Sequence, residues 1–219
     1  MCPRKSGWSS LTLIASRGCS TTAPGGCGTR SRTEWKQAGP WTLTSTNLIG
    51  SIQMVRAALP RLRAQGGGRI IQLSTYGGQA AFPGGSLYHA SKWGIEGFIE
   101  AVGQEVAPFN IGCTLVEPGG ARTEFRFGGA KLGPKMYAYA DTPAGMTRAM
   151  LQDTSRLPIG DPAKMVKLMI DSVEQNPAPK RIVLGSDSYT VIQKSLAERL
   201  AAVEAQKDIA FSTDFPKSA

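Results

Sequence analysis

Apolar residues recur with two different periods between Thr44 and the end of the chain. Spacings of three and four predict helices at about 48–62, 88–107, 162–173 and 192–203, the first of them disturbed by Pro60. Short apolar runs bounded by Gly, Pro or Asn predict strands at 69–74, 111–117 and 181–184. This alternation of strands and helices is typical of an α/β fold with a parallel sheet.

Two further segments interrupt or flank this pattern. Residues 118–160 predict a long, loop-like insertion, and such segments in compact domains are usually lids or binding loops. The insertion ends at Asp161, which should cap the next helix, with Pro162 at its first position. Residues 1–43 show no sustained period, although Leu11, Leu13 and Ile14 form a small apolar cluster. We therefore divide the chain into an irregular segment, 1–43, and one domain, 44–219.

Composition and charge exclude several classes of protein. The 219 residues include 25 Lys and Arg and 16 Asp and Glu, which gives a net charge of +9. Residues 1–46 hold six of the basic residues and one acidic residue, so +5 of the +9 comes from this segment. Neither a helix-turn-helix pattern nor a basic stripe interleaved with aromatic residues is present, so we expect no nucleic-acid partner. No apolar run of about 18 residues predicts a membrane span.

The cysteines and the single histidine limit the chemistry further. The four cysteines form no C-x-x-C pair, so we expect neither a disulfide framework nor a metal site, and we expect a reducing, cytoplasmic environment. His89 is the only histidine, which excludes His-rich metal sites. We expect His89 to be an exposed helical residue and Trp93 to lie in the core.

Tyr88 and Lys92 form the first candidate for catalysis. Residues four apart near the start of a helix lie on the same face, one turn from each other. A nearby ammonium favours the phenolate and should lower the pKa of Tyr88 from its ordinary value near 10. Tyr88 would then be a usable general acid or base for a carbonyl or alcohol oxygen. By itself the Y-x-x-x-K pattern is weak, because any helix can carry this pair on a solvated surface.

Other polar residues surround this pair in the predicted fold. Ser74 and Thr75 follow the strand at 69–74, and Asn47 lies at the start of the preceding helix. Pro118-Gly119-Gly120-Ala121-Arg122-Thr123 follows the strand at 111–117. With these residues the chain resembles the short-chain dehydrogenase/reductase family over about residues 44–214.

The resemblance implies an active site and a cofactor. The family's catalytic Asn, Ser, Tyr and Lys would correspond to Asn47, Thr75 or Ser74, Tyr88 and Lys92. Tyr88 would donate the proton, Lys92 would also bind the nicotinamide ribose, and Asn47 would hold a water in the proton relay. Tyr88, Lys92, Pro118, Gly119 and Thr123 would border the nicotinamide of NAD or NADP. The implied fold is a Rossmann-like parallel sheet with flanking helices, truncated in its N-terminal half.

The hydroxyl partner and the substrate are less well defined. The family's usual spacing places Thr75 opposite Tyr88, whereas serine occurs one residue earlier, so Thr75 ranks first and Ser74 second. The stretch Ser74-Thr75-Tyr76-Gly77-Gly78, together with Phe82 and Phe125, resembles the 17β-hydroxysteroid dehydrogenase-like branch. The resemblance therefore implies an NAD(P)-dependent oxidoreductase that interconverts a hydrophobic alcohol and ketone.

One part of the family pattern is missing. The Gly-rich T-G-x-x-x-G-x-G turn, through which the backbone approaches the cofactor pyrophosphate, does not occur in the sequence. Two alternatives therefore remain open, a working oxidoreductase and a catalytically silent, truncated member that acts only through protein contacts. Truncation should also leave an unpaired edge on the strand at 69–74. A homo-oligomer through the helices that carry Asn47 and Tyr88 is expected, because family members usually dimerise through them.

The N-terminal segment suggests a hypothesis of its own. A shift of one base through Gly18–Gly25 permits Val-Leu-Asn-Asn-x-Ala-Gly, which is close to the family's N-N-A-G motif. Residues 1–43 would then be a frameshifted reading of a family gene, and the encoding DNA would show an intact motif in the other frame.

Overall fold

A parallel sheet forms the centre of the computed structural model, which describes residues 11–14, 43–125, 132–153 and 155–215. Its strands lie side by side in chain order: β1 (Leu11–Ile14), β2 (Gly68–Leu73), β3 (Ile111–Pro118) and β4 (Arg181–Leu184). Each neighbouring pair is parallel. The three strands predicted from the sequence are confirmed, with bounds that differ by one residue at most.

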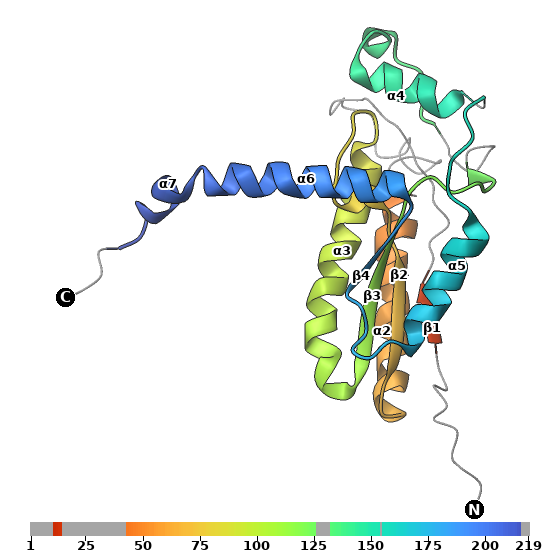
Figure 1. Ribbon diagram of the computed structural model, residues 1–219, viewed down its shortest axis with the longest axis vertical. Coiled ribbons are helices and arrows are strands. Elements are labelled where there is room, and N and C mark those ends of the chain that lie inside the picture. Colours follow the sequence, from red (N-terminus) through yellow and green to blue (C-terminus); the bar gives the residue numbers. More distant parts are fainter. Residues whose placement is uncertain (1–10, 15–42, 126–131, 154, 216–219) are drawn as a thin grey trace, which may run out of the picture.

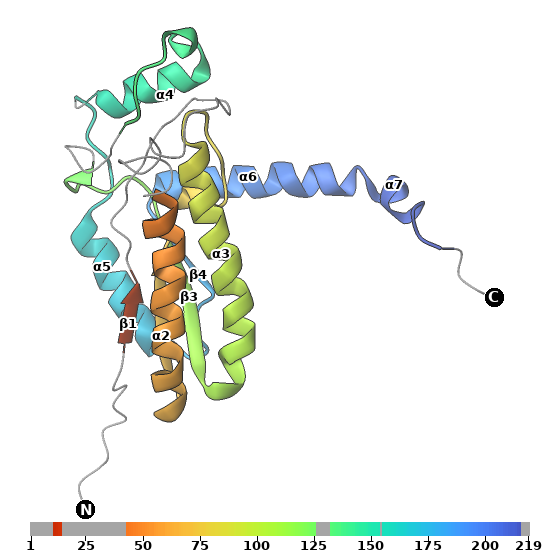
Figure 2. The same ribbon diagram turned by 180° about the vertical axis from the view of Figure 1, so that it is seen from behind.

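Helices cover both faces of this sheet (Figures 1 and 2). A π-helical turn, η2 (Ser45–Gly50), leads into α2 (Ser51–Ala64), which continues through Pro60. This helix lies beside α3 (Ser86–Val106) on one face, and α5 (Pro162–Asp171) lies on the other with the beginning of α6 (Ser186–Glu204). The predicted Rossmann-like α/β architecture is therefore confirmed.

Alternation along the two central strands separates two apolar cores. Ile70 and Leu115 face α2 and α3, where they pack with residues such as Val55, Ile95 and Ile99. The next residues along each strand, Ile71 and Val116, pack with Met165, Val173 and Leu184 on the opposite face. Because successive strand residues point to opposite faces, the continuous apolar runs of the sequence fill both cores.

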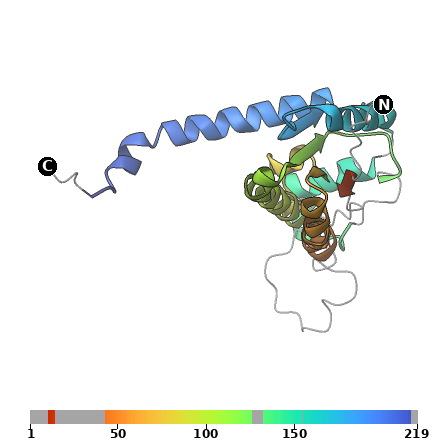
Figure 3. The same cartoon turned by 90° about the horizontal axis from the view of Figure 1, so that it is seen from below.

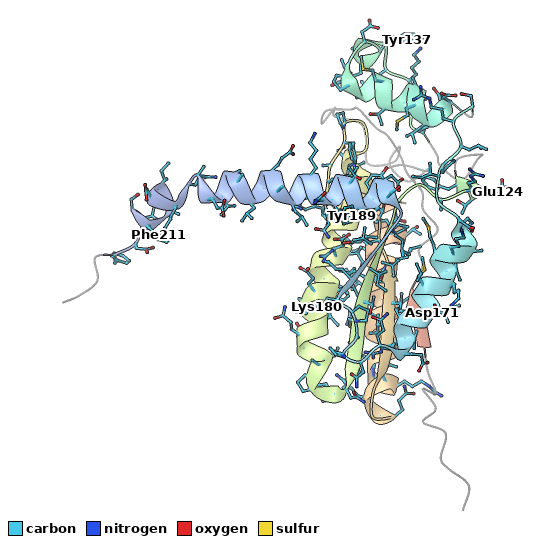
Figure 4. All side chains as sticks on the ribbon, viewed as in Figure 1. Glu124, Tyr137, Asp171, Lys180, Tyr189 and Phe211 are labelled. Carbon is cyan, nitrogen blue, oxygen red and sulfur yellow. The ribbon has the colours of Figure 1, made fainter. Side chains whose placement is uncertain are left out.

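The insertion after β3 is more ordered than the sequence pattern predicts. It contains α4 (Pro143–Gln152) and a 3₁₀ turn, η6 (Tyr137–Tyr139), so the expectation of a loop-like segment over its whole length is wrong. Tyr137 lies at its outer end, far from Asp171 and Lys180 at the opposite end of the sheet (Figure 4). The expected cap at its end is confirmed, since Asp161 Oδ1 accepts hydrogen bonds from Ala163 N and Lys164 N.

The expectation that β2 has an unpaired edge is wrong. Leu11–Ile14, at the small apolar cluster of the N-terminal segment, pairs with residues 69–72 of β2. Four residues are too few for a period to emerge from the sequence, and their pairing depends on the edge that β2 offers. The rest of the segment, residues 1–10 and 15–42, lies outside the described residues, and the division at residue 43 stays a prediction.

The C-terminal helices extend away from the sheet. Only the beginning of α6 lies on the sheet, and its later turns and α7 (Lys207–Phe211) project sideways (Figure 3). Leu196, Leu200 and Val203 form an exposed apolar stripe along this projection. In the part of the chain that the structure describes, no helix is long and apolar enough to cross a membrane.

Candidate active site

Three of the predicted catalytic residues, Thr75, Tyr88 and Lys92, meet at the carboxyl end of the sheet. β2 ends at Leu73 and β3 ends at Pro118, so the residues that follow both strands lie at the same edge. Lys92, on the second turn of α3, donates from Nζ to the carbonyl oxygen of Leu73 at 3.3 Å. Ligands of open α/β sheets bind outside this edge, so the fold brings the candidate residues to its usual binding side.

Thr75, and not Ser74, faces Tyr88. The hydroxyls of Thr75 and Tyr88 are hydrogen-bonded, and Thr75 Oγ1 also donates to the carbonyl oxygen of Pro118 at 3.3 Å. Ser74 Oγ instead donates to Glu96 Oε1 at 2.5 Å, inside the protein. The geometry therefore favours Thr75 as the hydroxyl partner and gives Ser74 a structural contact.

Tyr88 and Lys92 lie close together, but burial dominates their protonation. Lys92 Nζ is 5.9 Å from the centre of the Tyr88 ring. Burial raises the pKa of Tyr88 to about 12, against a smaller lowering by the hydrogen bond with Thr75. The expected lowering by the ammonium is thus wrong for the protein alone, because removing the phenolate from water costs more than the nearby cation returns. Tyr88 is therefore a fully protonated donor at neutral pH.

Burial also disfavours the charged form of Lys92. Its side chain is 4% exposed, and burial lowers the pKa of Lys92 to about 8, partly offset by the negative charge of Glu96. The pKa remains above neutral pH, so Lys92 is still mainly charged there. Its ammonium has three donor hydrogens and one hydrogen-bond acceptor among the described residues, which leaves two for a ligand or water.

A cluster of charged residues lies next to the site and is connected to it through Glu96, which accepts a hydrogen bond from Ser74. Arg181 Nη1 contacts Glu117 Oε1 and lies 2.7 Å from Glu96 Oε2, and Nη2 lies 2.6 Å from Glu100 Oε1. Gln79 Nε2 donates to Glu117 Oε1 at 2.6 Å. Glu117 is fully buried and Glu96 is nearly so. This cluster was not predicted from the sequence. A glutamate within an apolar strand, as Glu117 is, could have indicated it, because a buried carboxylate usually has a charged partner.

Asn47 is buried with an unsatisfied amide. Its side chain is 0% exposed, and neither Oδ1 nor Nδ2 has a hydrogen-bond partner among the described residues. Its own carbonyl oxygen accepts from Ser51 Oγ at 3.0 Å within the π-helical turn. A buried amide without protein partners is usually satisfied by water, which fits the implied role of holding a relay water.

The segment after β3 is tied to the start of α6. Gly119 N donates to the carbonyl oxygen of Leu184 at 2.7 Å, and Gly120 N donates to Asp187 Oδ2 at 2.8 Å. A Cβ on Gly119 would overlap the Asp187 carboxylate, so this position has no room for a side chain. Thr123 is exposed, and its hydroxyl accepts from Phe125 N at 3.4 Å. Pro118 and Gly119 therefore lie at the site edge, and Thr123 lies further along the segment.

Two expectations for α3 are wrong. His89 is buried, at 8% exposed, because both ring nitrogens bind backbone atoms of the loop before the helix. Trp93 is 39% exposed, and the Arg199 guanidinium lies over its ring at 4.8 Å. The loop before α3 covers His89, and Arg199 of α6 lies against Trp93. The helical period of α3 alone predicts neither of these contacts.

The comparisons with known proteins identify the family of this chain. The family described as short chain dehydrogenase matches residues 19–128. The chain belongs to the short-chain dehydrogenase family. The match begins inside the segment 1–43, and the family is one whose members bind NAD or NADP.

In the described ranges, no group of three or more His, Cys, Asp or Glu residues could hold a metal ion.

Relatives and solved structures show how much of the family fold is present. The chain is 33% identical to "Oxidoreductase BOA17" of Botryotinia fuckeliana over 71% of its length and 56% of that protein. It is 30% identical to "Uncharacterized oxidoreductase C162.03" of Schizosaccharomyces pombe, covering 79% of this chain and 59% of that protein. The chain thus spans little more than half the length of these curated relatives.

Among solved structures, a short-chain dehydrogenase from Streptomyces avermitilis matches with a TM-score of 0.77 and 30% identity, over 95% of this chain and 72% of that one. A short chain dehydrogenase from Burkholderia cenocepacia, solved in complex with NADP, has the same fold. Its TM-score is 0.57 and its identity 19%, over 88% of this chain and 69% of that one.

Proposed function

We propose that this chain is an NAD(P)-dependent oxidoreductase that interconverts a hydrophobic alcohol and ketone. The observation that supports this most is the group formed by Thr75, Tyr88 and Lys92 at the carboxyl end of the sheet. The bound nicotinamide would supply or accept the hydride. Lys92, Tyr88, Pro118 and Gly119 border the place for it, with Thr123 beyond them.

In the reduction direction, the ketone oxygen would accept hydrogen bonds from the hydroxyl of Tyr88 and from that of Thr75, whose single hydrogen would turn to it from the carbonyl oxygen of Pro118. Tyr88 is protonated at neutral pH, and its hydroxyl can transfer the proton because the alkoxide that develops on the substrate is more basic than the phenolate. The charged Lys92 would stabilise the phenolate that remains. The unsatisfied amide of Asn47 would hold a water that returns a proton to the site.

A hydrophobic substrate agrees with two exposed aromatic residues, Phe82 and Phe125, of which Phe82 is connected to Tyr88 through the ring of His89. Phe82 lies before α3 and is 40% exposed, and its ring is 5.7 Å from that of Tyr76. Phe125, in the segment after β3, is also exposed. Such aromatic faces bind apolar groups and leave the polar hydroxyls to orient the carbonyl.

The second candidate is a catalytically silent family member that acts through protein contacts. It is favoured by the absence of a T-G-x-x-x-G-x-G turn from the sequence. Titration of the purified chain with NADH and NADPH, followed by fluorescence or calorimetry, separates the two. Saturable binding that Gly119→Asp abolishes supports the oxidoreductase, and no binding at millimolar cofactor supports the silent form.

Self-association is part of the same proposal. Ile49 on η2, Met54 on α2 and Trp93 on α3 are exposed on the helices expected to pair. Sedimentation at micromolar concentration should show a discrete homo-oligomer, and a monomer would reject this part.

Localisation in the cytoplasm remains a proposal, to be tested by fractionation of the source cells.

A further inference from the structure

His89 holds a loop beside the candidate active site through both of its ring nitrogens. Nε2 accepts from the backbone N–H of Phe82 at 3.0 Å. Nδ1 lies 2.8 Å from the carbonyl oxygen of Gly77, which can only accept. Nδ1 must therefore carry the hydrogen and Nε2 must lack one. These two partners select one neutral tautomer of the imidazole.

The loop is shaped to fit this ring. A Cβ on Gly77 would lie 3.1 Å from Nδ1 and Cε1 of His89, and a Cβ on Gly85 would lie 3.1 Å from Nε2. At both glycines an added Cβ would press against the imidazole and shift it by a few tenths of an ångström. The amide of His89 also donates to the carbonyl oxygen of Gly85 at 2.9 Å, within the start of α3.

The loop places the ring of Phe82 in a group of aromatic rings that includes Tyr88. The ring of His89 lies 5.8 Å from that of Phe82 and 5.7 Å from that of Tyr88, and Tyr76 continues the group through Phe82. The middle of the loop has a separate anchor, because the carbonyl oxygen of Gln79 accepts from Ser195 Oγ at 2.8 Å and from Arg199 Nη2 at 2.9 Å. His89 thus holds the loop at Gly77 and Phe82, and α6 holds it between them, at Gln79.

We propose that His89 is a positioning residue for substrate binding: as the Nδ1-protonated neutral imidazole, it joins Gly77 to Phe82 and sets where the Phe82 ring lies relative to the Tyr88 hydroxyl. This inference rests on the proposed function for the identity of the substrate. Its structural part, the tautomer and the two backbone bonds, does not depend on turnover. His89 touches no reacting atom in this proposal.

A spectroscopic test uses the fact that the chain contains one histidine. Protein labelled with ¹⁵N-histidine should give one imidazole in a long-range proton–nitrogen correlation spectrum. At neutral pH we expect a protonated Nδ1, an unprotonated Nε2 and slow exchange of the backbone N–H of Phe82. A protonated Nε2, or an exchange-averaged imidazole, would overturn the proposal whether or not the chain turns over substrate.

Two variants test the effect on the substrate. His89→Asn can reach Gly77 but is too short for Phe82, whereas His89→Gln can place an amide oxygen near Phe82 N. With an apolar ketone, His89→Asn should raise KM about tenfold, the effect of one lost buried hydrogen bond, with kcat nearly unchanged. His89→Gln should lie between His89→Asn and the original chain. Equal KM for all three, or a loss confined to kcat, would contradict the proposal.

Absence of turnover in the original chain would reject the proposed function instead. The Phe82 amide exchange in the same two variants would then decide the positioning role. Faster exchange in His89→Asn than in His89→Gln supports it, and equal exchange in the two rejects it.

Discussion

Replacing Lys92 by methionine should stabilise the fold while it removes activity. The buried ammonium has a single acceptor among the described residues, the carbonyl oxygen of Leu73. That oxygen also accepts from Gln72 Nε2 at 3.0 Å, so it keeps a partner when the lysine is lost. Glu96 likewise keeps its contacts with Ser74 and Arg181. Lys92→Met therefore removes an incompletely satisfied charge and leaves no newly orphaned group.

The magnitude follows from the protonation of Lys92. A fall in pKa from 10.5 to about 8 corresponds to about 3 kcal/mol of destabilisation when the lysine is charged in both states. Because the folded pKa is lowered, this cost is fully present below about pH 8 and disappears as the pH rises toward the unfolded value. We expect the free energy of unfolding to increase by about 1–3 kcal/mol in Lys92→Met at about pH 7. The gain should shrink by roughly 2 kcal/mol at about pH 9.5.

Urea unfolding of both proteins at the two pH values measures this difference. Lys167→Met provides a matched control, because Lys167 is exposed and, within the described part of the chain, pairs only with Asp171 four residues later. The control should change the free energy of unfolding by less than about 0.5 kcal/mol at either pH. Destabilisation by Lys92→Met, or a gain that does not depend on pH, would refute the reasoning.

Three further predictions concern the rest of the scaffold. Arg181→Met leaves the two buried carboxylates below the site unpaired and should lower the free energy of unfolding by about 3–5 kcal/mol in urea titrations; a loss below about 1 kcal/mol would show that the cluster is solvated. Asp161→Ala removes the cap of α5 and should cost about 0.5–2 kcal/mol by thermal unfolding, whereas Asp161→Asn should cost less. Gly119→Ala forces its Cβ against Asp187 and should weaken cofactor binding at least about tenfold by calorimetry, while unchanged affinity would place the cofactor elsewhere.

Regular packing made much of the fold predictable from the sequence. The central strands β2 and β3 carry apolar runs that fill the cores on both faces, and the short run Ile182–Leu184 marks β4 at the edge of the sheet; such runs are recognisable without tertiary information. The cap at Asp161 follows from a local pattern of the same kind. Tyr88 and Lys92 were predictable as neighbours because helical geometry alone places residues four apart on one face.

Contacts between distant segments account for what could not be predicted. His89 is buried because the loop from Gly77 to Gly85 folds back over it, and no helical period encodes that contact. The pairing of Leu11–Ile14 depends on a strand more than fifty residues later. The raised pKa of Tyr88 depends on how much water the surrounding chain excludes, which the spacing to Lys92 does not reveal.

Oxidation of NADPH and NADH by the purified chain, with a panel of apolar ketones, tests the central claim most directly when Tyr88→Phe is measured beside it. Tyr88→Phe keeps the ring and removes the hydroxyl that Thr75 contacts. The account predicts ketone-dependent oxidation by the original chain and a loss of at least about a hundredfold in kcat for the variant. Equal turnover by the two proteins, or no ketone-dependent turnover by the original chain, would contradict it.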